Sequence, residues 1–149
     1  MNTLEQQQHK DVARRALEEV CARGDFAKAE QFYSPAFRDH VNSLEFRGLE
    51  GVRQSVGMYR AVFPDLGIQV DDQVVDGDRV ASRWTARGTN RGKRATLIGI
   101  TISHIQDGKI VEDWSVSDTA GLLQQLGPRR AALLGASQLL AHLRGRKRS

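Results

Sequence analysis

Two acidic residues in predicted β-strands have the clearest capacity for chemistry. Asp39 lies in a short strand predicted over residues 37–41, and Asp113 lies in a strand predicted over residues 109–117. A carboxyl group in a dry pocket has a shifted pKa and can move a proton to or from carbon. We predict both as catalytic residues. A surface strand position for Asp39 and a rim salt bridge for Asp113 are the structural alternatives.

Two further polar residues lie next to predicted strands. His40 follows Asp39 directly, so its side chain is expected on the opposite face of the strand. It is a third catalytic candidate that would orient the base, and the alternative is that it holds a turn. Asp118 follows the last strand and precedes a short helix, where it is either a substrate-binding residue or an N-cap.

Aromatic residues offer walls for a pocket that would take a flat aromatic substrate. Aromatic side chains at these spacings also build ordinary hydrophobic cores, so both interpretations stay open. The candidates are Tyr33, Tyr59, Phe63, Trp84 and Trp114.

The last hairpin decides which residues share a face. Residues 106–108 suit a three-residue loop that ends in glycine, which would set Ile105 opposite Lys109. This register predicts a small, polar face, suited to a cavity wall, that carries Gly99, Thr101, Asp113 and Ser115. The opposite face would be bulky and apolar, suited to a packed interface, and would carry Ile98, Ile100, Ile102, His104, Ile110, Glu112, Trp114 and Val116.

Hydrophobic periodicity places helices first and strands afterwards. Helices are predicted from a capping box at Thr3 and Gln6 to Gly24, after an Asp25 cap up to Ser34 and Pro35, and over 49–63. A period of two then predicts antiparallel strands, and a short helix closes the domain. The strands cover 66–75, 79–89, 95–105 and 109–117, and the helix covers 119–126. This order is the α+β pattern, and we expect a small barrel of curved antiparallel sheet packed on the N-terminal helices around a cavity.

Composition indicates one globular domain of 149 residues, with a net charge of +4. We expect a domain over 1–127 and a basic helical tail over 128–149, whose apolar side would carry Ala131, Leu134, Leu139 and Leu143. The tail has no aromatic residue, so nucleic-acid binding is not expected. No apolar stretch suggests a membrane span or signal peptide, and Cys21 is the single cysteine, so a cytoplasmic location is the default.

Sequence motifs argue against most cofactors. There is no His-x-His, Cys-x-x-Cys or His-Glu-x-x-His pattern for a metal, and no glycine loop that would cradle a phosphate. We therefore expect neither a metal nor another cofactor in this chain.

The order and spacing of several short segments resemble the SnoaL-like polyketide cyclase family, within the wider superfamily of nuclear transport factor 2. The resemblance covers roughly residues 8–127. It rests on residues 51–53 (GVR), 63–66 (FPDL), 76–80 (DGDRV), 88–89 (GT), 107–114 (DGKIVEDW), and 118–119 (DT) with 121–127 (GLLQQLG).

The resemblance implies a cone-shaped α+β barrel and a set of cavity residues. In cyclases of this family an aspartate after the Asp-Gly-Lys-Ile turn is the acid and base of an aldol closure, and this chain has Ser115 there. The family's cavity histidine and glutamine correspond to Thr101 and Gly99, and its cavity asparagine corresponds to Asp39. An epoxide-hydrolase arrangement, with Arg83 between two aspartates, is disfavoured because Thr85 occupies a partner position.

The resemblance therefore implies a polyketide-tailoring enzyme of antibiotic biosynthesis. Loss of the cyclase residues favours a hydroxylase-like activity on an aromatic polyketide over aldol cyclisation, with a separate reductase as a possible partner. An aldol-type cyclase, a small-ketone isomerase or hydratase, and a non-catalytic ligand-binding or dimerisation module are the alternatives. On each of these readings we expect a homodimer through the apolar sheet face.

Overall fold

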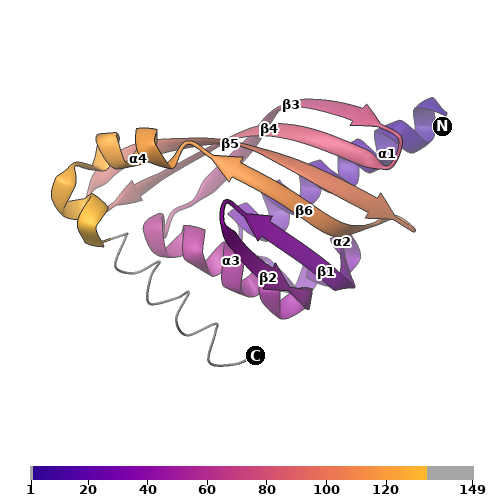
Figure 1. The fold of residues 1–149 in the computed structure, drawn as a ribbon, viewed down its shortest axis with the longest axis horizontal. Coiled ribbons are helices and arrows are strands. Elements are labelled where there is room, and N and C mark those ends of the chain that lie inside the picture. Colours follow the sequence, from indigo (N-terminus) through magenta and orange to yellow (C-terminus); the bar gives the residue numbers. More distant parts are fainter. Residues whose placement is uncertain (1, 134–149) are drawn as a thin grey trace.

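The computed structural model describes residues 2–133, which fold into helices packed on one curved sheet (Figure 1). The last predicted helix lies mostly outside the described residues, although 128–133 are helical. The elements in chain order are α1 (Thr3–Arg15), η1 (Ala16–Ala22), η2 (Phe26–Lys28), α2 (Ala29–Phe32), β1 (Tyr33–Val41), β2 (Leu44–Arg47), α3 (Gly48–Val62), β3 (Gly67–Asp76), β4 (Arg79–Asn90), β5 (Lys93–Gln106), β6 (Lys109–Ser117) and α4 (Thr119–Leu126).

The sheet has six strands in the order β2-β1-β6-β5-β4-β3. Neighbouring strands are antiparallel except for β1 and β6, which pair in parallel. Helices α1 to α3 lie against one face of the curved sheet, and α4 lies at one end of it (Figure 1). The predicted α+β class and the N-terminal helices are confirmed, and the sheet stays open between its β2 and β3 edges rather than closing.

The N-terminal helix begins one residue earlier than its predicted capping box. Asn2 accepts a hydrogen bond from the Glu5 backbone at 2.8 Å, and the Glu5 carboxylate accepts one from the Asn2 backbone at 3.3 Å. Thr3 and Gln6 are therefore inside the reciprocal cap rather than forming it. The helix continues through η1, which is a π-helix, and ends at Gly24. The φ of Gly24 is +68°, a left-handed value that glycine accepts without strain.

The predicted strand over residues 37–41 is longer in the structure and begins at Tyr33. Pro35 lies within it, between Tyr33 and Arg38, where the register of the β1–β6 pairing shifts, and proline is tolerated in strands at such irregularities. Strand β2, which the sequence analysis missed, pairs antiparallel with β1 through a turn at Asn42, whose φ is +52°. The predicted side-chain cap at Asp25 does not form.

The predicted register of the last hairpin is wrong, but most of its residues lie on the predicted face of the sheet. Asp107 and Gly108 both have positive φ and form a two-residue turn, so Gln106 pairs with Lys109. An irregularity follows, and one extra residue of β6 shifts the pairing so that Thr101 lies opposite Ser115. Because the shift restores the alternation, Asp113 still faces inward, opposite Ser103. Ile110, predicted on the outer face, is instead a core residue with 1% exposure.

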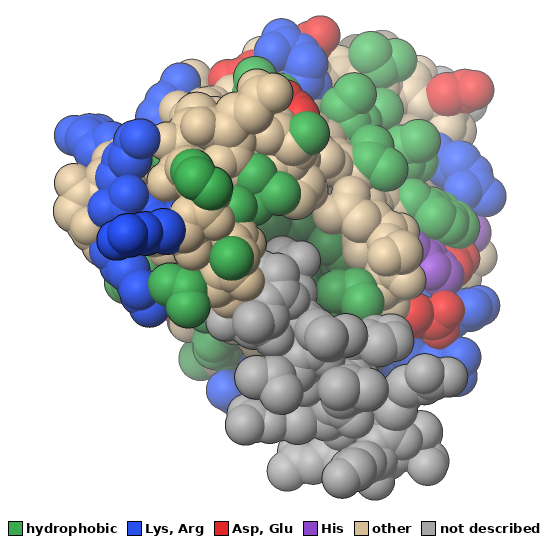
Figure 2. Space-filling model, turned by 60° about the vertical axis from the view of Figure 1, so that its left-hand side comes forward, with side chains coloured by type: hydrophobic (Ala, Val, Ile, Leu, Met, Phe, Trp, Pro, Cys, Tyr) green, Lys and Arg blue, Asp and Glu red, His purple; other side chains and the backbone are tan. Residues whose placement is uncertain are grey.

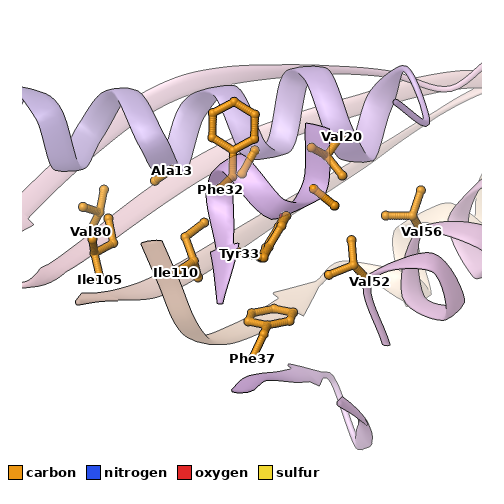
Figure 3. Packing of buried hydrophobic residues seen from close by; sticks show 12 residues of the cluster. Ala13, Val20, Phe32, Tyr33, Phe37, Val52, Val56, Val80, Ile105 and Ile110 are labelled. Carbon is orange, nitrogen blue, oxygen red and sulfur yellow. The ribbon is translucent and has the colours of Figure 1, made fainter. Parts of the chain in front are cut away.

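Two hydrophobic clusters fill the space between helices and sheet. The first joins the N-terminal helices to β1 and the start of β6, and Figure 3 shows Phe32, Tyr33 and Phe37 packed between Val20, Val52 and Ile110. The second lies at the other end and contains Phe63, Trp84, Leu97 and Leu126. The described helices include none that is long and apolar enough to cross a membrane.

Charge is spread unevenly over the surface. The turn between β4 and β5 carries three exposed basic residues, Arg91, Lys93 and Arg94. Seen from the α4 side, Lys and Arg side chains form a cluster at the left edge, and hydrophobic side chains are scattered over the rest of the face (Figure 2).

Candidate active site

A cavity lies between the helices and the inner face of the sheet. The empty space there, with the open solvent at its mouth included, is about 600 Å³. Its wall is mainly apolar, with residues of η1, α3, β1 and β3 to β6. Its polar side chains are Asp39, Ser55, Thr101, Asp113 and Ser115, together with Cys21, Tyr33, Tyr59 and Trp84.

Asp39 and Asp113 lie side by side in this wall. They are direct partners in the parallel pairing of β1 and β6, and strands in a sheet are about 4.8 Å apart. Each residue is 7% exposed, and both line the cavity. Within residues 2–133, Oδ1 of Asp113 has no hydrogen-bond partner. A buried carboxyl oxygen without a partner is costly, and a ligand in the cavity would relieve that cost.

Burial shifts the titration of both carboxyl groups in the same direction. Burial raises the pKa of Asp39 from an ordinary 3.8 to about 6, and a Ser55 hydrogen bond and the charge of His40 oppose this shift. Burial also raises the pKa of Asp113 well above its ordinary value, and the nearby charge of Asp39 adds to the shift. Both groups therefore hold a proton to higher pH than an exposed aspartate, and the repulsion between two neighbouring negative charges favours a pair that shares one proton, one base beside one acid.

A row of hydrogen-bonded side chains lies beside the carboxyl pair. The Trp84 indole donates to the Thr101 hydroxyl at 2.9 Å, and Thr101 and Ser115 are 2.8 Å apart, oxygen to oxygen. All three residues line the cavity. Gly99 makes room for the indole, because a Cβ at this position would lie 2.3 Å from Trp84.

Two other polar groups of the cavity wall, on η1 and β1, stay neutral. The Tyr33 hydroxyl and the Cys21 sulfur are 3.6 Å apart. Burial raises the pKa of Cys21 to about 12 and that of Tyr33 well above its usual range. These side chains therefore add no charge near the carboxyl pair at neutral pH.

The sequence pattern of the SnoaL-like polyketide cyclases matches residues 11–126, most of the chain. This protein belongs to the SnoaL-like polyketide cyclase family. Among curated proteins, no sequence matches it.

Solved structures agree with this assignment. IdmH from Streptomyces antibioticus, a candidate polyketide cyclase, is 29% identical to this SnoaL-like protein with a TM-score of 0.72, covering 81% of this chain and 99% of its own. A candidate polyketide cyclase from Bacillus cereus is 30% identical with a TM-score of 0.76 and covers 85% of each chain. AclR from Streptomyces galilaeus, a candidate hydroxylase, has a TM-score of 0.69 over 82% of this chain and 97% of its own, and at 24% identity it shows the fold alone.

The structure brings most of the predicted site residues of this SnoaL-like protein to one cavity. Seven of the predicted residues line its wall: Tyr33, Asp39, Tyr59, Trp84, Thr101, Asp113 and Ser115. Phe63 instead packs in the second core cluster, against the position of Gly88. Asp118 caps α4 by accepting a hydrogen bond from the Gly121 backbone at 2.9 Å, the structural alternative weighed for it. Gly99 contributes through the space that it leaves for Trp84.

His40 lies on the opposite face of β1 from Asp39, as strand alternation predicts. Its Nε2 is 2.6 Å from a Glu112 oxygen, and its ring stacks on Trp114 at 5.5 Å between centroids. Trp114 is also on this outer face, so it does not line the cavity as one interpretation had it. The charge of His40 still reaches Asp39, whose pKa it lowers.

Sequence reasoning missed two buried serines beside the carboxyl groups. Ser55 lies on the buried side of α3 near Asp39, and Ser103 is the β5 partner of Asp113. Ser55 was detectable as a polar residue one position before Val56 in an otherwise apolar helical stripe. The residues 2–133 contain no group of three His, Cys, Asp or Glu side chains arranged to hold a metal ion.

Proposed function

We propose that this protein binds a hydrophobic aromatic molecule of the polyketide type and transfers protons at an activated C–H or phenolic O–H group. The observation that carries the proposal is the Asp39–Asp113 pair, buried in the wall of an otherwise apolar cavity. Aromatic side chains of Tyr33, Tyr59 and Trp84 around the cavity suit a flat substrate.

In an enolisation, one carboxyl group acts as the base and the other acts as the acid. The ionised Asp39 removes a proton from the carbon beside a carbonyl, and the C–H electron pair forms the enol double bond. The carbonyl π electrons move to oxygen, which takes the proton of Asp113, so the pair holds one proton before and after the step. In an aldol closure the enol carbon then attacks a second carbonyl, whose oxygen receives the proton now held by Asp39, while the enol O–H returns its proton to Asp113 and the first carbonyl re-forms. Removal of a proton by a positioned base contributes about 10²- to 10⁴-fold to such a reaction.

Of ring closure and hydroxylation, the two reactions that could follow this proton transfer, we favour a hydroxylase-like reaction. The residues lining the cavity at the family's cyclase positions are Thr101 and Ser115, which replace the histidine and aspartate implied by the resemblance. Hydroxylation would begin with the same base, Asp39, acting on a phenol. Insertion of one atom of O₂ with reduction of the other to water takes two electrons and two protons, which a separate reductase would supply. Oxygen uptake in the presence of an electron donor separates this outcome from ring closure.

We also propose that two copies associate through the outer sheet face. This face carries six large hydrophobic side chains that are 37% to 65% exposed, and a large contiguous apolar patch on a protein surface marks an interaction site. They are Val74, Ile98, Ile100, Ile102, Trp114 and Val116.

The proton-transfer proposal is tested by deuterium exchange into 2-tetralone, a flat aromatic ketone, in D₂O buffer near neutral pH. We expect the protein to accelerate incorporation at the carbon between the ring and the carbonyl. Asp39→Asn should reduce the protein-catalysed rate at least 100-fold, and Asp113→Asn should reduce it less, because water can protonate the oxygen.

Asp76→Asn, an exposed aspartate at the end of β3, is the matched control and should exchange at the original rate. Circular dichroism checks that each variant is folded. Binding of 2-tetralone without acceleration would favour the ligand-binding module, and full rates in both active-site variants would contradict the assigned roles.

A further inference from the structure

The Trp84, Thr101 and Ser115 side chains form a row whose hydrogen bonds have one favoured direction. An indole N–H can only donate, so the 2.9 Å contact makes the Thr101 oxygen an acceptor. Thr101 is 2% exposed, and within residues 2–133 its hydroxyl has no polar partner other than Trp84 and Ser115. Donation from Thr101 to Ser115 is favoured, because it gives the more deeply buried Thr101 proton an acceptor and leaves the unpaired proton on the more exposed Ser115.

This direction leaves the Ser115 proton free for a ligand. Ser115 already accepts from Thr101, and no other acceptor for its hydroxyl proton is present among the described residues. Its side chain is half-buried and lines the cavity. A hydroxyl that accepts one hydrogen bond becomes a better donor in a second, because chains of hydrogen bonds polarise one another. The row therefore ends in a donor that points toward the cavity.

The position of Ser115 relative to Asp113 limits which substrate atoms the two can contact. They are two residues apart on the inner face of β6, a separation of about 6.6 Å along a strand. A hydrogen bond of about 2.8 Å from each group covers most of this span, so one substrate oxygen between them can accept from both. Because Asp39 is the strand partner of Asp113, the atom that loses a proton to Asp39 must be a close neighbour of that oxygen, as it is in a ketone or a phenol.

We infer that Ser115 donates a hydrogen bond to the carbonyl or phenolate oxygen of the substrate, with Thr101 and Trp84 as the positioning residues that fix its hydroxyl. This rests on the proposed function, since it names the substrate atom that the carboxyl pair acts beside. Ser115 thereby stabilises the negative charge that develops on oxygen when Asp39 removes a proton. The substrate class is narrowed to molecules with an oxygen on, or next to, the carbon that loses the proton.

The packing around Trp84 shows how the row is held in place. Its indole lies over Gly99, where a Cβ would be 2.3 Å from the ring. The Tyr59 ring packs edge-on against it, at 6.4 Å between centroids and 88° between planes. With the ring fixed from two sides, its N–H has one direction, and the orientation of the Thr101 hydroxyl follows from it.

The inference is tested by isotope-edited infrared difference spectroscopy of 2-tetralone labelled with ¹³C at the carbonyl. A donor to the carbonyl oxygen lowers its stretching frequency. We expect the bound ketone to absorb at lower frequency in the original protein than in Ser115→Ala. The same variant should bind the ketone about 3- to 10-fold more weakly, the usual effect of one lost hydrogen bond.

The positioning residues have a more specific signature. Thr101→Val and Trp84→Phe should each shift the band part of the way toward that of Ser115→Ala. Adding Thr101→Val to Ser115→Ala should move the band no further, because Thr101 acts only through Ser115. Ser115→Thr, which keeps a hydroxyl, should restore the low frequency. Ser34→Ala, a serine of β1 outside the cavity lining, is the matched control and should leave the band unchanged.

The band is read without turnover, so this test separates the inference from the proposed function. A low-frequency band that depends on Ser115 in Asp39→Asn supports the inference even if deuterium exchange is never observed. The inference is overturned if the bound ketone absorbs at the same frequency in the original protein and in Ser115→Ala. It is also overturned if no band of bound ketone is detected. An additional shift from Thr101→Val in the Ser115→Ala background overturns the positioning role.

Discussion

Asp39 on β1 and Asp113 on β6 face the same cavity from directly paired positions in the parallel part of the sheet. Taken alone, each is an ordinary inward-facing residue of a strand. Together they make a buried carboxyl pair in which burial and mutual repulsion disfavour ionisation of both groups at once. The proposed function depends on this pairing.

The pH dependence of proton transfer follows from the pKa of Asp39. The base must be ionised, and burial raises its pKa to about 6. The rate of deuterium exchange into 2-tetralone should therefore rise as pH increases through about 6 and level off above it. A rate that is already constant from pH 4.5 upward would exclude Asp39 as the base.

Asp39 should also make the protein less stable as pH rises. Its pKa is higher in the folded protein than in the unfolded chain, so the folded state holds more protons between pH 4 and 6. Its contribution to the free energy of unfolding is therefore lost as pH rises through this window, by up to about 3 kcal/mol. Asp39→Asn lacks this loss, so its unfolding free energy relative to the original protein should increase from pH 4 to pH 7.5. Urea unfolding at both pH values measures it, and a constant difference would contradict the raised pKa.

A substitution at Gly99 should displace the Trp84 ring without removing a polar group from the site. A Cβ there would lie 2.3 Å from the Trp84 ring, so Gly99→Ala must displace the indole at a cost of about 1–3 kcal/mol in unfolding free energy. The near-ultraviolet circular dichroism of tryptophan should change with it. Gly57→Ala, in α3 with no atom within 4 Å of the added carbon, should leave stability equal or higher. Equal effects of the two substitutions would show that the indole does not depend on Gly99.

Dimerisation should depend on the outer sheet face. Light scattering after size-exclusion chromatography should give twice the chain mass, and Ile100→Lys should give the monomer because a charge would be buried at the interface. Leu4→Lys, at an exposed apolar residue of α1, should remain a dimer. A monomeric original protein would refute the proposed association.

The sequence predicted the elements well where periodicity is strong and less well where pairing is long-range. Helix α3 and the strands β3 to β6 are within two residues of their predicted ends, because apolar spacing and glycine turns define them locally. The parallel pairing of β1 with β6 joins residues more than 70 positions apart, and no local pattern specifies it. Asp39 and Asp113 could therefore be predicted as separate candidates but not as neighbours.

The hairpin register failed for a different reason. The turn residues Asp107 and Gly108 suit two-residue and three-residue loops alike, and the extra residue of β6 that restores the alternation leaves no mark in the sequence. Thr101 and Ser115 were thus assigned to the correct face with the wrong partners. Their hydrogen bond to each other, and the contact with Trp84, emerged only from the three-dimensional arrangement.

The carboxyl pair is tested most directly by titrating the side-chain carboxyl carbons of ¹³C-labelled aspartate by nuclear magnetic resonance, with assignments from Asp39→Asn and Asp113→Asn. We predict that Asp39 titrates near pH 6 and that Asp113 remains protonated well above the ordinary range. In Asp39→Asn the pKa of Asp113 should fall while staying elevated, since burial is its larger cause. If both carboxyl groups titrate near pH 4, independently of each other, the buried acid–base pair does not exist.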